Sequence, residues 1–244
     1  AAAGILEGPN NLLAAEYLRA LRREARQIRP RPVLRMGAGH RDQAAAGGIA
    51  SAGAIREIMR RGGDWENLVP EVSRPFAVPD LWPDDCSAAL SAVLLRCSRA
   101  QLCDYEDVSD DLAGRILAQA PYLMSFTELA QAVQTRAYSL ARVRRALCHI
   151  LLGIRRGARP PRVLRVLGLR AASPVPALLK QNALWPVISK AADADPQSVK
   201  SMCDAAALYR QAVWQRSGRR LPGDLRQSPV ILEEDGRLRN CPES

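Results

Sequence analysis

The stretch S-L-A-R-V-R-R-A-L-C-H-I-L-L-G-I-R-R, residues 139–156, has the residue spacing of an amphipathic helix. Projected at 100° per residue, its apolar side chains fall within one sector of about 100°. They are Leu140, Val143, Leu147, Ile150, Leu151 and Ile154. Arg142, Arg145, His149 and Arg156 fall on the opposite side, within about 60°. We therefore expect a helix with one face in the core and one basic face.

The same segment lies inside a long run that contains no acidic side chain. Residues 129–192 carry ten arginines and two lysines, a formal charge of +12 against +10 for the whole chain. No acid is available within the run to form i, i+4 ion pairs. Positive charge that is not neutralised locally attracts polyanions, nucleic acid first among them. We interpret the run as a nucleic-acid-binding surface, and a solvated basic face without a partner is the alternative.

The overall composition favours a mainly α fold. The 244 residues are 48% hydrophobic but only 5% aromatic, with abundant Ala and Leu, which is typical of helical proteins. The six cysteines form no C-x-x-C pair and have no histidine at ligand spacing, so we expect reduced thiols, no metal site and a cytoplasmic location. No run of 18 apolar residues is present, which predicts no membrane span.

The order of sequence signals predicts two domains. Residues 1–70 indicate a helix over 12–26, a strand over 33–36, a glycine turn and a helix over 51–61, the tail end of a Rossmann-like α/β domain. Prolines mark a linker at 71–84. An all-helical domain over 85–217 and a loosely ordered tail over 218–244 follow. The helices expected in that domain cover 85–103, 109–119, 127–134, 139–156, 176–192 and 196–217.

Short segments near the start have features of a nucleotide site. Ser51 precedes a predicted helix, where free backbone N–H groups favour phosphate, and Arg56 lies about one turn further on. A plain helix cap with a surface arginine is the alternative. Arg35 and Met36 end a predicted strand before glycines, where α/β folds bind ligands, although a simple turn would look the same. Asn10 is suited either to capping a helix or to contacting a base or ribose.

The three segments in this order are a more specific indication of a protein family than any one of them alone. They read G-P-N-N-L-L-A-A-E-Y-L-R-A-L (8–21), R-M-G-A-G-H-R-D (35–42) and I-A-S-A-G-A-I-R (49–56). They resemble the bacterial tRNA(Met) cytidine acetate ligases, which belong to the nucleotidyltransferase-like superfamily. The resemblance continues in T-R-A-Y-S-L-A-R-V-R-R (135–145) and R-V-L-G-L (165–169), so that it spans roughly residues 6–215.

The resemblance implies an enzyme that activates acetate with ATP as acetyl-adenylate. That enzyme then acetylates N4 of the wobble cytidine of elongator tRNA(Met), with Mg²⁺ as a conceivable further ion. By motif match, the nucleotide-binding residues would be Asn10, Arg35, Met36, Ser51 and Arg56. Together with the charge pattern, it assigns to the tRNA contacts Arg136, Arg142, Arg144, Arg145, His149, Arg156 and Arg165.

The chain departs from the family pattern in its histidines. Members of the family carry a His-x-Gly-His motif, whose histidines stabilise charge on the phosphate, but His40 and His149 are the only histidines here and neither lies in such a motif. Gly53 also stands where a hydroxyl residue is expected. We therefore expect a C-terminal fragment that is not competent alone. Two further hypotheses are a non-catalytic helical RNA-binding module and a basic scaffold for a protein partner.

Overall fold

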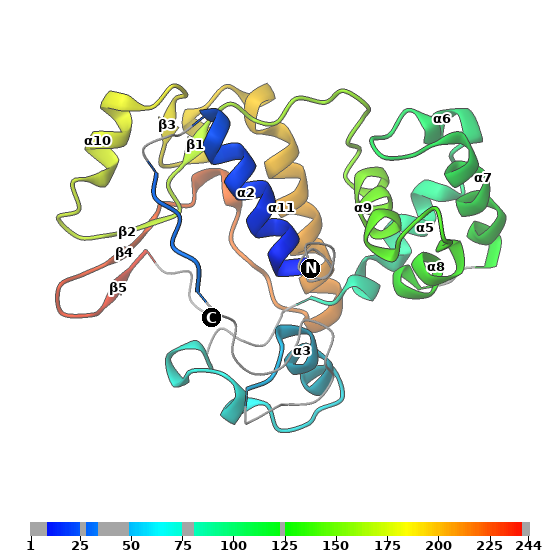
Figure 1. Ribbon diagram of the computed structural model, residues 1–244, viewed down its shortest axis with the longest axis horizontal. Helices are drawn as coiled ribbons and strands as arrows, with labels where there is room; N and C mark the ends of the chain where they lie inside the picture. The colour runs from blue at the N-terminus through cyan, green and yellow to red at the C-terminus, as the bar shows by residue number, and fades with distance from the viewer. Residues whose placement is uncertain (1–8, 25–27, 34–48, 75–80, 123–124, 241–244) are drawn as a thin grey trace. The chain divides into compact units, whose positions relative to one another are not determined.

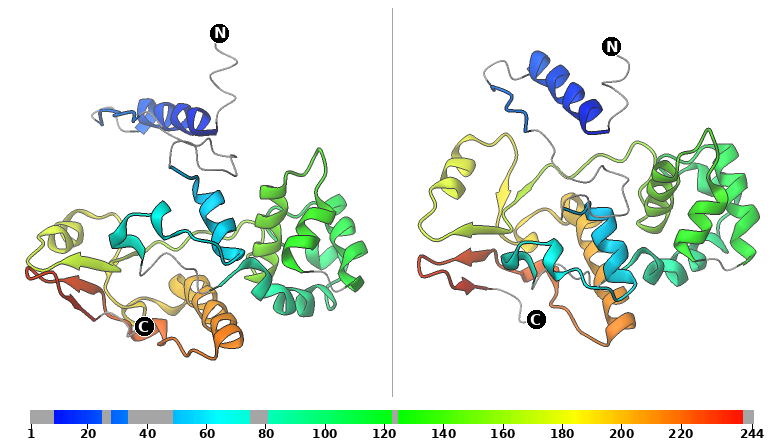
Figure 2. Two further views of the ribbon diagram at one scale, coloured as in Figure 1. Left: turned by 90° about the horizontal axis from the view of Figure 1, so that it is seen from below. Right: turned by 60° about the horizontal axis from the view of Figure 1, so that its bottom comes forward.

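The computed structural model describes residues 9–24, 28–33, 49–74, 81–122 and 125–240 (Figure 1, Figure 2). The chain divides into two compact units, Ala1–Pro79 and Asp80–Ser244. Helices make up most of both units, and every strand that the structure describes belongs to the second. The expected mainly α character is therefore present, but its distribution differs from the prediction.

Helix α2 (Pro9–Glu24) opens the described part of the first unit. It begins at Pro9 rather than at residue 12, because proline fits the first helical turn, where its missing N–H would have no intrahelical partner. Asn10 therefore lies within the first turn and not at the cap. The apolar side chains of this helix stay largely exposed: Leu12, Leu13, Tyr17 and Leu18.

Helix α3 (Ala52–Arg60) forms where the sequence predicted it. Its cap is Ser51, and the chain leaves the helix through Gly62, whose φ of +70° suits glycine. The short 3₁₀ turns η1 (Glu66–Leu68) and η2 (Glu71–Ser73) follow. The strand expected over 33–36 stays untested, since residues 34–36 lie outside the described ones.

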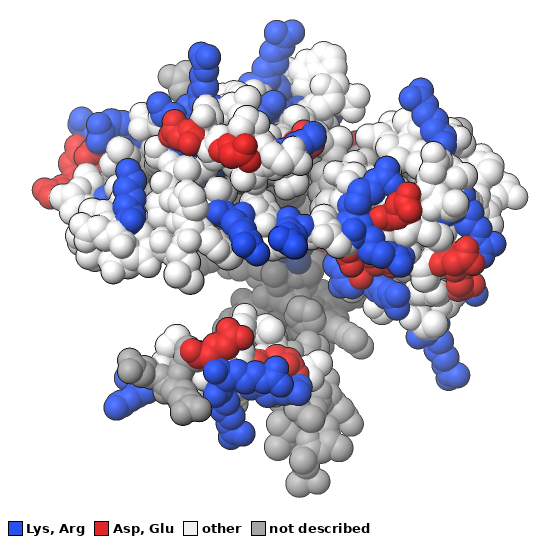
Figure 3. Space-filling view, turned by 90° about the horizontal axis from the view of Figure 1, so that it is seen from above, with Lys and Arg blue, Asp and Glu red and all other residues white. Residues whose placement is uncertain are grey.

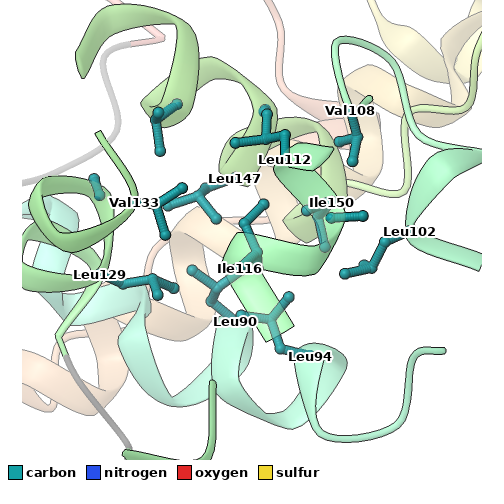
Figure 4. Close-up of a cluster of buried hydrophobic side chains, with 14 of the residues drawn as sticks. Leu90, Leu94, Leu102, Val108, Leu112, Ile116, Leu129, Val133, Leu147 and Ile150 are labelled. Carbon is teal, nitrogen blue, oxygen red and sulfur yellow. The ribbon is translucent and has the colours of Figure 1, made fainter. Parts of the chain in front are cut away.

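Five short helices and two 3₁₀ turns form the first part of the second unit. They are η3 (Pro83–Cys86), α5 (Ser87–Leu94), α6 (Arg99–Cys103), α7 (Asp110–Gln119), η4 (Ala120–Tyr122), α8 (Phe126–Val133) and α9 (Leu140–Leu151). Figure 4 shows their apolar side chains meeting in one cluster. Leu102, Leu112, Ile116 and Leu147 are completely buried there. This cluster holds the helices in place and so positions the basic residues on their outer surface.

The single helix predicted over 85–103 is in fact two helices, α5 and α6. Ser98 starts α6 with a capping box: its hydroxyl accepts from the N–H of Gln101, and the Gln101 side chain accepts from the N–H of Ser98. Both apolar faces still reach the core, through Leu94 and Leu102. Periodicity alone could not separate the helices, because it continues across the break.

Helix α9 confirms the predicted core face but is shorter than the predicted 139–156. Val143, Leu147 and Ile150 are buried, as the projection required. The helix ends at Leu151 because Gly153 adopts a left-handed conformation with φ +70°. Arg156 therefore lies beyond the helix, and the prediction that it shares a helical face with Arg142 is wrong.

The remainder of the second unit corrects the expectation of an all-helical domain. Strand β1 (Leu164–Arg165) pairs in parallel with β3 (Val187–Ile188). Strand β2 (Gly168–Arg170) pairs in parallel with β4 (Val230–Leu232), which pairs antiparallel with β5 (Leu238–Arg239). The last two strands lie in the tail expected to be loosely ordered, and β4 is held between β2 and β5.

The helix predicted over 176–192 is only α10 (Val175–Asn182). Pro186 biases the residue before it away from the helical conformation, and the chain continues into β3 instead. Helix α11 (Pro196–Ser217) matches its prediction. It contacts η5 (Ala191–Asp193) and η6 (Asp224–Arg226), and near its other end an ion pair of 2.7 Å joins Arg216 to Asp85. In this way α11 connects the strand-containing part with the helical part of the same unit.

The described ranges contain neither a candidate membrane-spanning helix nor a candidate metal site. None of their helices is long and apolar enough to cross a membrane. Nor do they hold a group of three or more His, Cys, Asp or Glu side chains suited to a metal ion. The five described cysteines are free thiols, and burial raises the pKa of Cys86 and Cys148, which favours the protonated, unreactive form.

Candidate nucleotide and nucleic-acid sites

Ser51 shapes the start of α3 from a nearly buried position. Its side chain is part of a residue that is only 4% exposed, and its hydroxyl accepts a hydrogen bond of 3.1 Å from the N–H of Ala54. The backbone carbonyl of Ser51 accepts from the N–H of Ile55 at 3.0 Å. The hydroxyl thus satisfies one of the helix's first amides, and the structure supports its role as a cap directly.

Arg56 is exposed and takes no part in the ion pairs of its own helix. The neighbouring carboxylate of Glu57 is occupied by Arg60 and Arg61, at 2.9 and 2.7 Å. The hydrogen bond from Arg60 lowers the pKa of Glu57, so that this carboxylate is ionised and engaged near neutral pH. In the described part of the chain Arg56 forms no ion pair, and its charge is available to an anion.

The structure has room at position 53 for the hydroxyl residue that the family pattern has in place of Gly53. A Cβ atom added there would meet only the Ser51 hydroxyl oxygen, at 3.7 Å, which is an ordinary contact. The departure at this position is therefore not imposed by packing.

The remaining nucleotide-site residues are not brought together by the described structure. Asn10 is exposed in the first turn of α2, and no hydrogen bond or ion pair between described residues joins it to Ser51 or Arg56. Arg35 and Met36 lie outside the described residues. The nucleotide site thus rests on the start of α3.

Arg142, on the basic side of α9, packs against an aromatic ring. The guanidinium of Arg142 lies over the Tyr138 ring, 4.9 Å from its centre, and the Tyr138 hydroxyl is 2.8 Å from the hydroxyl of Ser109. A guanidinium over an aromatic face keeps its charge while its orientation is restricted. Arg136 and Arg144 on either side are exposed. We refer to Arg136, Arg142 and Arg144 as the basic group on α9; Arg142 is half-buried and the other two are exposed.

Arg145, by contrast, is paired across the fold. Its guanidinium donates two hydrogen bonds to the carboxylate of Asp107, from Nε to Oδ2 and from Nη2 to Oδ1. These bonds lower the pKa of Asp107 and raise the pKa of Arg145, which stabilises both charges. Nδ1 of His149 lies 3.0 Å from the carbonyl oxygen of Glu106 and 3.5 Å from Asp107 Oδ2. Both basic residues are thus bound to the 104–108 loop.

The chain after α9 is fastened to the same loop. The guanidinium of Arg155 lies over the Tyr105 ring at 4.2 Å and is 3.5 Å from Asp104 Oδ2. Arg156 donates from Nη2 to the carbonyl oxygen of Val108 at 2.7 Å, and its backbone N–H donates to the carbonyl of Asp104, also at 2.7 Å. Arg156 therefore has a structural role that sequence spacing did not reveal.

Arg165 differs most from its expected role. Its side chain is 7% exposed, and Nη1 forms an ion pair of 2.7 Å with Asp224. Nη2 donates to the backbone carbonyl of Asp224 at 3.0 Å. This residue connects β1 to η6 in the interior, so its guanidinium group is bound within the protein and not exposed at the surface.

The acid-free run is therefore neutralised in part by acids from outside it. Asp104, Asp107 and Asp224 engage Arg155, Arg145 and Arg165. The other seven arginines of the run form no ion pair with an acid in the described residues: Arg136, Arg142, Arg144, Arg156, Arg159, Arg162 and Arg170. Figure 3 shows the result on one face, with basic side chains spread over the surface and fewer acidic ones between them.

Sequence reasoning missed the 104–108 loop as the partner of the basic residues. A signal was present, because Asp104, Glu106 and Asp107 stand close together shortly before the acid-free run. Spacing alone, however, does not say which residues will pair.

Known proteins are similar in sequence to most of this chain. The sequence model of the HIGH Nucleotidyl Transferase family matches residues 1–221. A tRNA(Met) cytidine acetate ligase from Syntrophomonas wolfei is 27% identical, over 93% of this chain and 61% of the relative. The protein of the same name from Syntrophotalea carbinolica is 33% identical, over 67% of this chain and 42% of the relative. The chain thus spans between 42% and 61% of the length of these two relatives.

Solved structures show the same fold. The crystal structure of apo Thermotoga maritima TmcAL superposes with a TM-score of 0.77 at 21% identity, covering 93% of this chain and 61% of that one. The crystal structure of the same protein bound with alpha-thio ATP gives a TM-score of 0.76 at 19% identity and covers 60% of that chain. The nucleotidyltransferase-like fold expected from the sequence is confirmed.

Proposed function

We propose, on the premise that this chain belongs to the HIGH Nucleotidyl Transferase family, that it acts as a tRNA(Met) cytidine acetate ligase. The observation that carries the proposal is the extent of the match, which reaches residue 221 and so includes both units. A relative of that name covers 93% of the chain.

The proposed reaction has two steps. An acetate oxygen attacks the α-phosphorus of ATP, and pyrophosphate leaves. The N4 amine of the wobble cytidine of elongator tRNA(Met) then attacks the carbonyl carbon of the acetyl-adenylate, AMP leaves with the electron pair, and N4 loses a proton to solvent. The crystal form of Thermotoga maritima TmcAL bound with alpha-thio ATP supports ATP as the cosubstrate.

The start of α3 is the proposed contact for the ATP phosphates. Ser51 holds the first turn, so that the remaining free amides there face outward, and Arg56 supplies a positive charge about one turn later. Asn10, Arg35 and Met36 complete the proposed site on the strength of the motif match. Mg²⁺ would be held mainly by ATP phosphate oxygens, since the described residues form no cluster of acidic or histidine ligands.

The proposed tRNA contacts divide into two classes. Arg136, Arg142 and Arg144 are the direct phosphate contacts, because none of them is bound to an acid in the described structure. Arg145 and His149 contribute through an orientation fixed by the 104–108 loop. Arg156 supports that loop, and Arg165 stabilises the interior, so neither is a direct contact in this proposal.

The decisive test is genetic and chemical. Deleting the gene in the source organism should remove N4-acetylcytidine from the wobble position of elongator tRNA(Met), measured by mass spectrometry of digested tRNA. Expression of the intact gene from a plasmid should restore it. A wild-type level of the modified nucleoside in the deletion strain would refute the proposal.

A non-catalytic RNA-binding module is the second candidate. It is favoured by the absence of a His-x-Gly-His motif from these 244 residues, which contain only His40 and His149. Under this alternative the deletion strain keeps its N4-acetylcytidine, while the purified chain still binds tRNA. Acetate-dependent exchange of pyrophosphate into ATP by the 244-residue chain would exclude it, because only an adenylating enzyme catalyses that exchange.

A further inference from the structure

A hollow of about 400 Å³ lies between the segment that follows α9 and the first turns of α11. One wall carries Arg159 and Arg162, and the other carries Gln197 and Ser201. All four residues belong to the second unit and are exposed. This is the Arg159–Arg162 hollow, and no role assigned above uses it.

The two arginines differ from their neighbours in that their side chains form no hydrogen bond or ion pair with any described residue. Arg155 and Arg156, shortly before them, are bound to Asp104 and to the Val108 carbonyl. Arg159 and Arg162 form no ion pair with any residue in the described ranges. Two unneutralised guanidinium groups in one hollow create a local positive potential that an anion relieves.

Proline fixes the backbone between the two arginines. The segment reads Arg159-Pro160-Pro161-Arg162 and lies outside helix and strand. Pro locks φ near −65°, and a polyproline II segment has about three residues per turn, so residues three apart project from the same side. Both guanidinium groups therefore face one hollow. Because proline already restricts the backbone between them, little further backbone entropy is lost when a ligand binds.

The opposite wall adds neutral donors and not a helix terminus. One of the first amides of α11 is already satisfied by Asp195, whose carboxylate accepts from the N–H and from the hydroxyl of Ser198 at 2.9 and 3.0 Å. Lys200 is likewise bound to Asp204 at 2.6 Å. Gln197 and Ser201, one turn apart, present an amide and a hydroxyl group into the hollow.

We propose that the Arg159–Arg162 hollow binds the phosphodiester backbone of RNA, as a second contact separate from the basic group on α9. A phosphodiester presents two charged oxygens, which arginine recognises with paired hydrogen bonds. The chemistry of the hollow calls for a phosphate and contains no feature that reads a base. The identity of the RNA as tRNA rests on the proposed function, but phosphate binding by the hollow does not.

The test uses the 244-residue chain and a transcript of elongator tRNA(Met), with binding followed by fluorescence anisotropy across a range of salt concentrations. Arg159→Ala/Arg162→Ala should weaken binding about tenfold or more near 0.1 M salt and reduce the slope of log K against log salt by about 1.4 to 1.8. The matched control is Arg96→Ala/Arg220→Ala, which removes two exposed charges outside the acid-free run. The control should change the slope far less.

Two further measurements keep the outcomes distinct. Circular dichroism must give the same melting temperature for both double variants, and Arg159→Lys/Arg162→Lys should recover part of the lost affinity. Loss of affinity equal to that of the control would overturn the proposal. So would a double variant that keeps RNA binding but no longer binds inorganic pyrophosphate, because the hollow would then hold a free anion.

An unrelated RNA hairpin separates this proposal from the proposed function. If the double variant loses affinity for both RNAs while the deletion strain keeps its N4-acetylcytidine, the hollow stands and the ligase assignment falls. If the chain is the ligase but RNA does not enter the hollow, both RNAs bind the double variant as tightly as they bind the control.

Discussion

Asp107 is the residue that determines how the basic side of α9 is used. It holds Arg145 with two hydrogen bonds, lies 3.5 Å from His149 Nδ1, and itself adopts a left-handed backbone with φ +64°. Asp and Asn tolerate that conformation better than other non-glycine residues. A substitution by Asn therefore tests the charge without disturbing the backbone.

Asp107→Asn should lower the free energy of unfolding by about 0.5 to 1 kcal/mol near pH 7, a modest value because the partner Arg145 is largely exposed. The pKa of Asp107 is depressed in the folded protein, so its contribution is present above the unfolded pKa and is lost as pH falls through the folded pKa. Urea unfolding should show the difference at pH 7 and its disappearance below about pH 4. A difference that persists in acid would show that the charge is not responsible.

Ser51 gives a second prediction for a single side chain. Because its hydroxyl accepts from the Ala54 N–H, Ser51→Ala should destabilise α3 by about 1 kcal/mol, whereas Ser51→Thr keeps an equivalent acceptor. Hydrogen exchange of the α3 amides should be about fivefold faster in the alanine variant and nearly unchanged in the threonine variant. Equal exchange in all three proteins would mean that the hydroxyl does not act as the cap.

Among the elements, those specified by local signals were predictable. Helices α3, α7, α8 and α11 lie close to their expected positions, because a capping side chain and apolar periodicity are both local properties of the sequence. Strands β2 and β4 were not predictable. They are three residues long, which is too short for a period, and each depends on a partner far along the chain.

The end of α9 shows how one residue limits an element. Gly153 has φ +70° and no atom within 4 Å of an added Cβ, so the cost of Gly153→Ala is backbone strain and not a clash. We expect destabilisation by about 1 kcal/mol in denaturant unfolding. Gly223→Ala is the control, since that glycine also faces open space but has an ordinary φ of −69°. The control should be neutral or slightly stabilised, and equal losses would contradict the conformational explanation.

At the scale of the whole molecule, the sequence was enough to identify the family. It was not enough to show which charged residues pair with one another. The resemblance to tRNA(Met) cytidine acetate ligases is confirmed by the family match and the relatives. The sequence also located the basic run correctly. It could not show that Asp107 and Asp224 bind two of its arginines, because those contacts arise only when distant segments pack together.

Arg165 and Asp224 provide the prediction at this scale, since their ion pair joins β1 to η6. Arg165→Met leaves the carboxylate of Asp224 without its partner and should cost about 3 kcal/mol in unfolding free energy. Arg165→Met/Asp224→Leu should recover much of that loss and bind tRNA as tightly as the unmodified chain. A folded double variant with weakened tRNA binding would instead make Arg165 a direct RNA contact.

The 104–108 loop has a consequence for how far from the protein its charge is felt. An arginine held against an aspartate acts on distant ions as a dipole, whose field decays faster with distance than that of a lone charge. Polyanions passing at long range therefore meet a weaker attraction than the formal charge of the run implies. If RNA binds as proposed above, its phosphates gain the full interaction only at the isolated guanidinium groups, where close contact counts for more than the formal charge of the run.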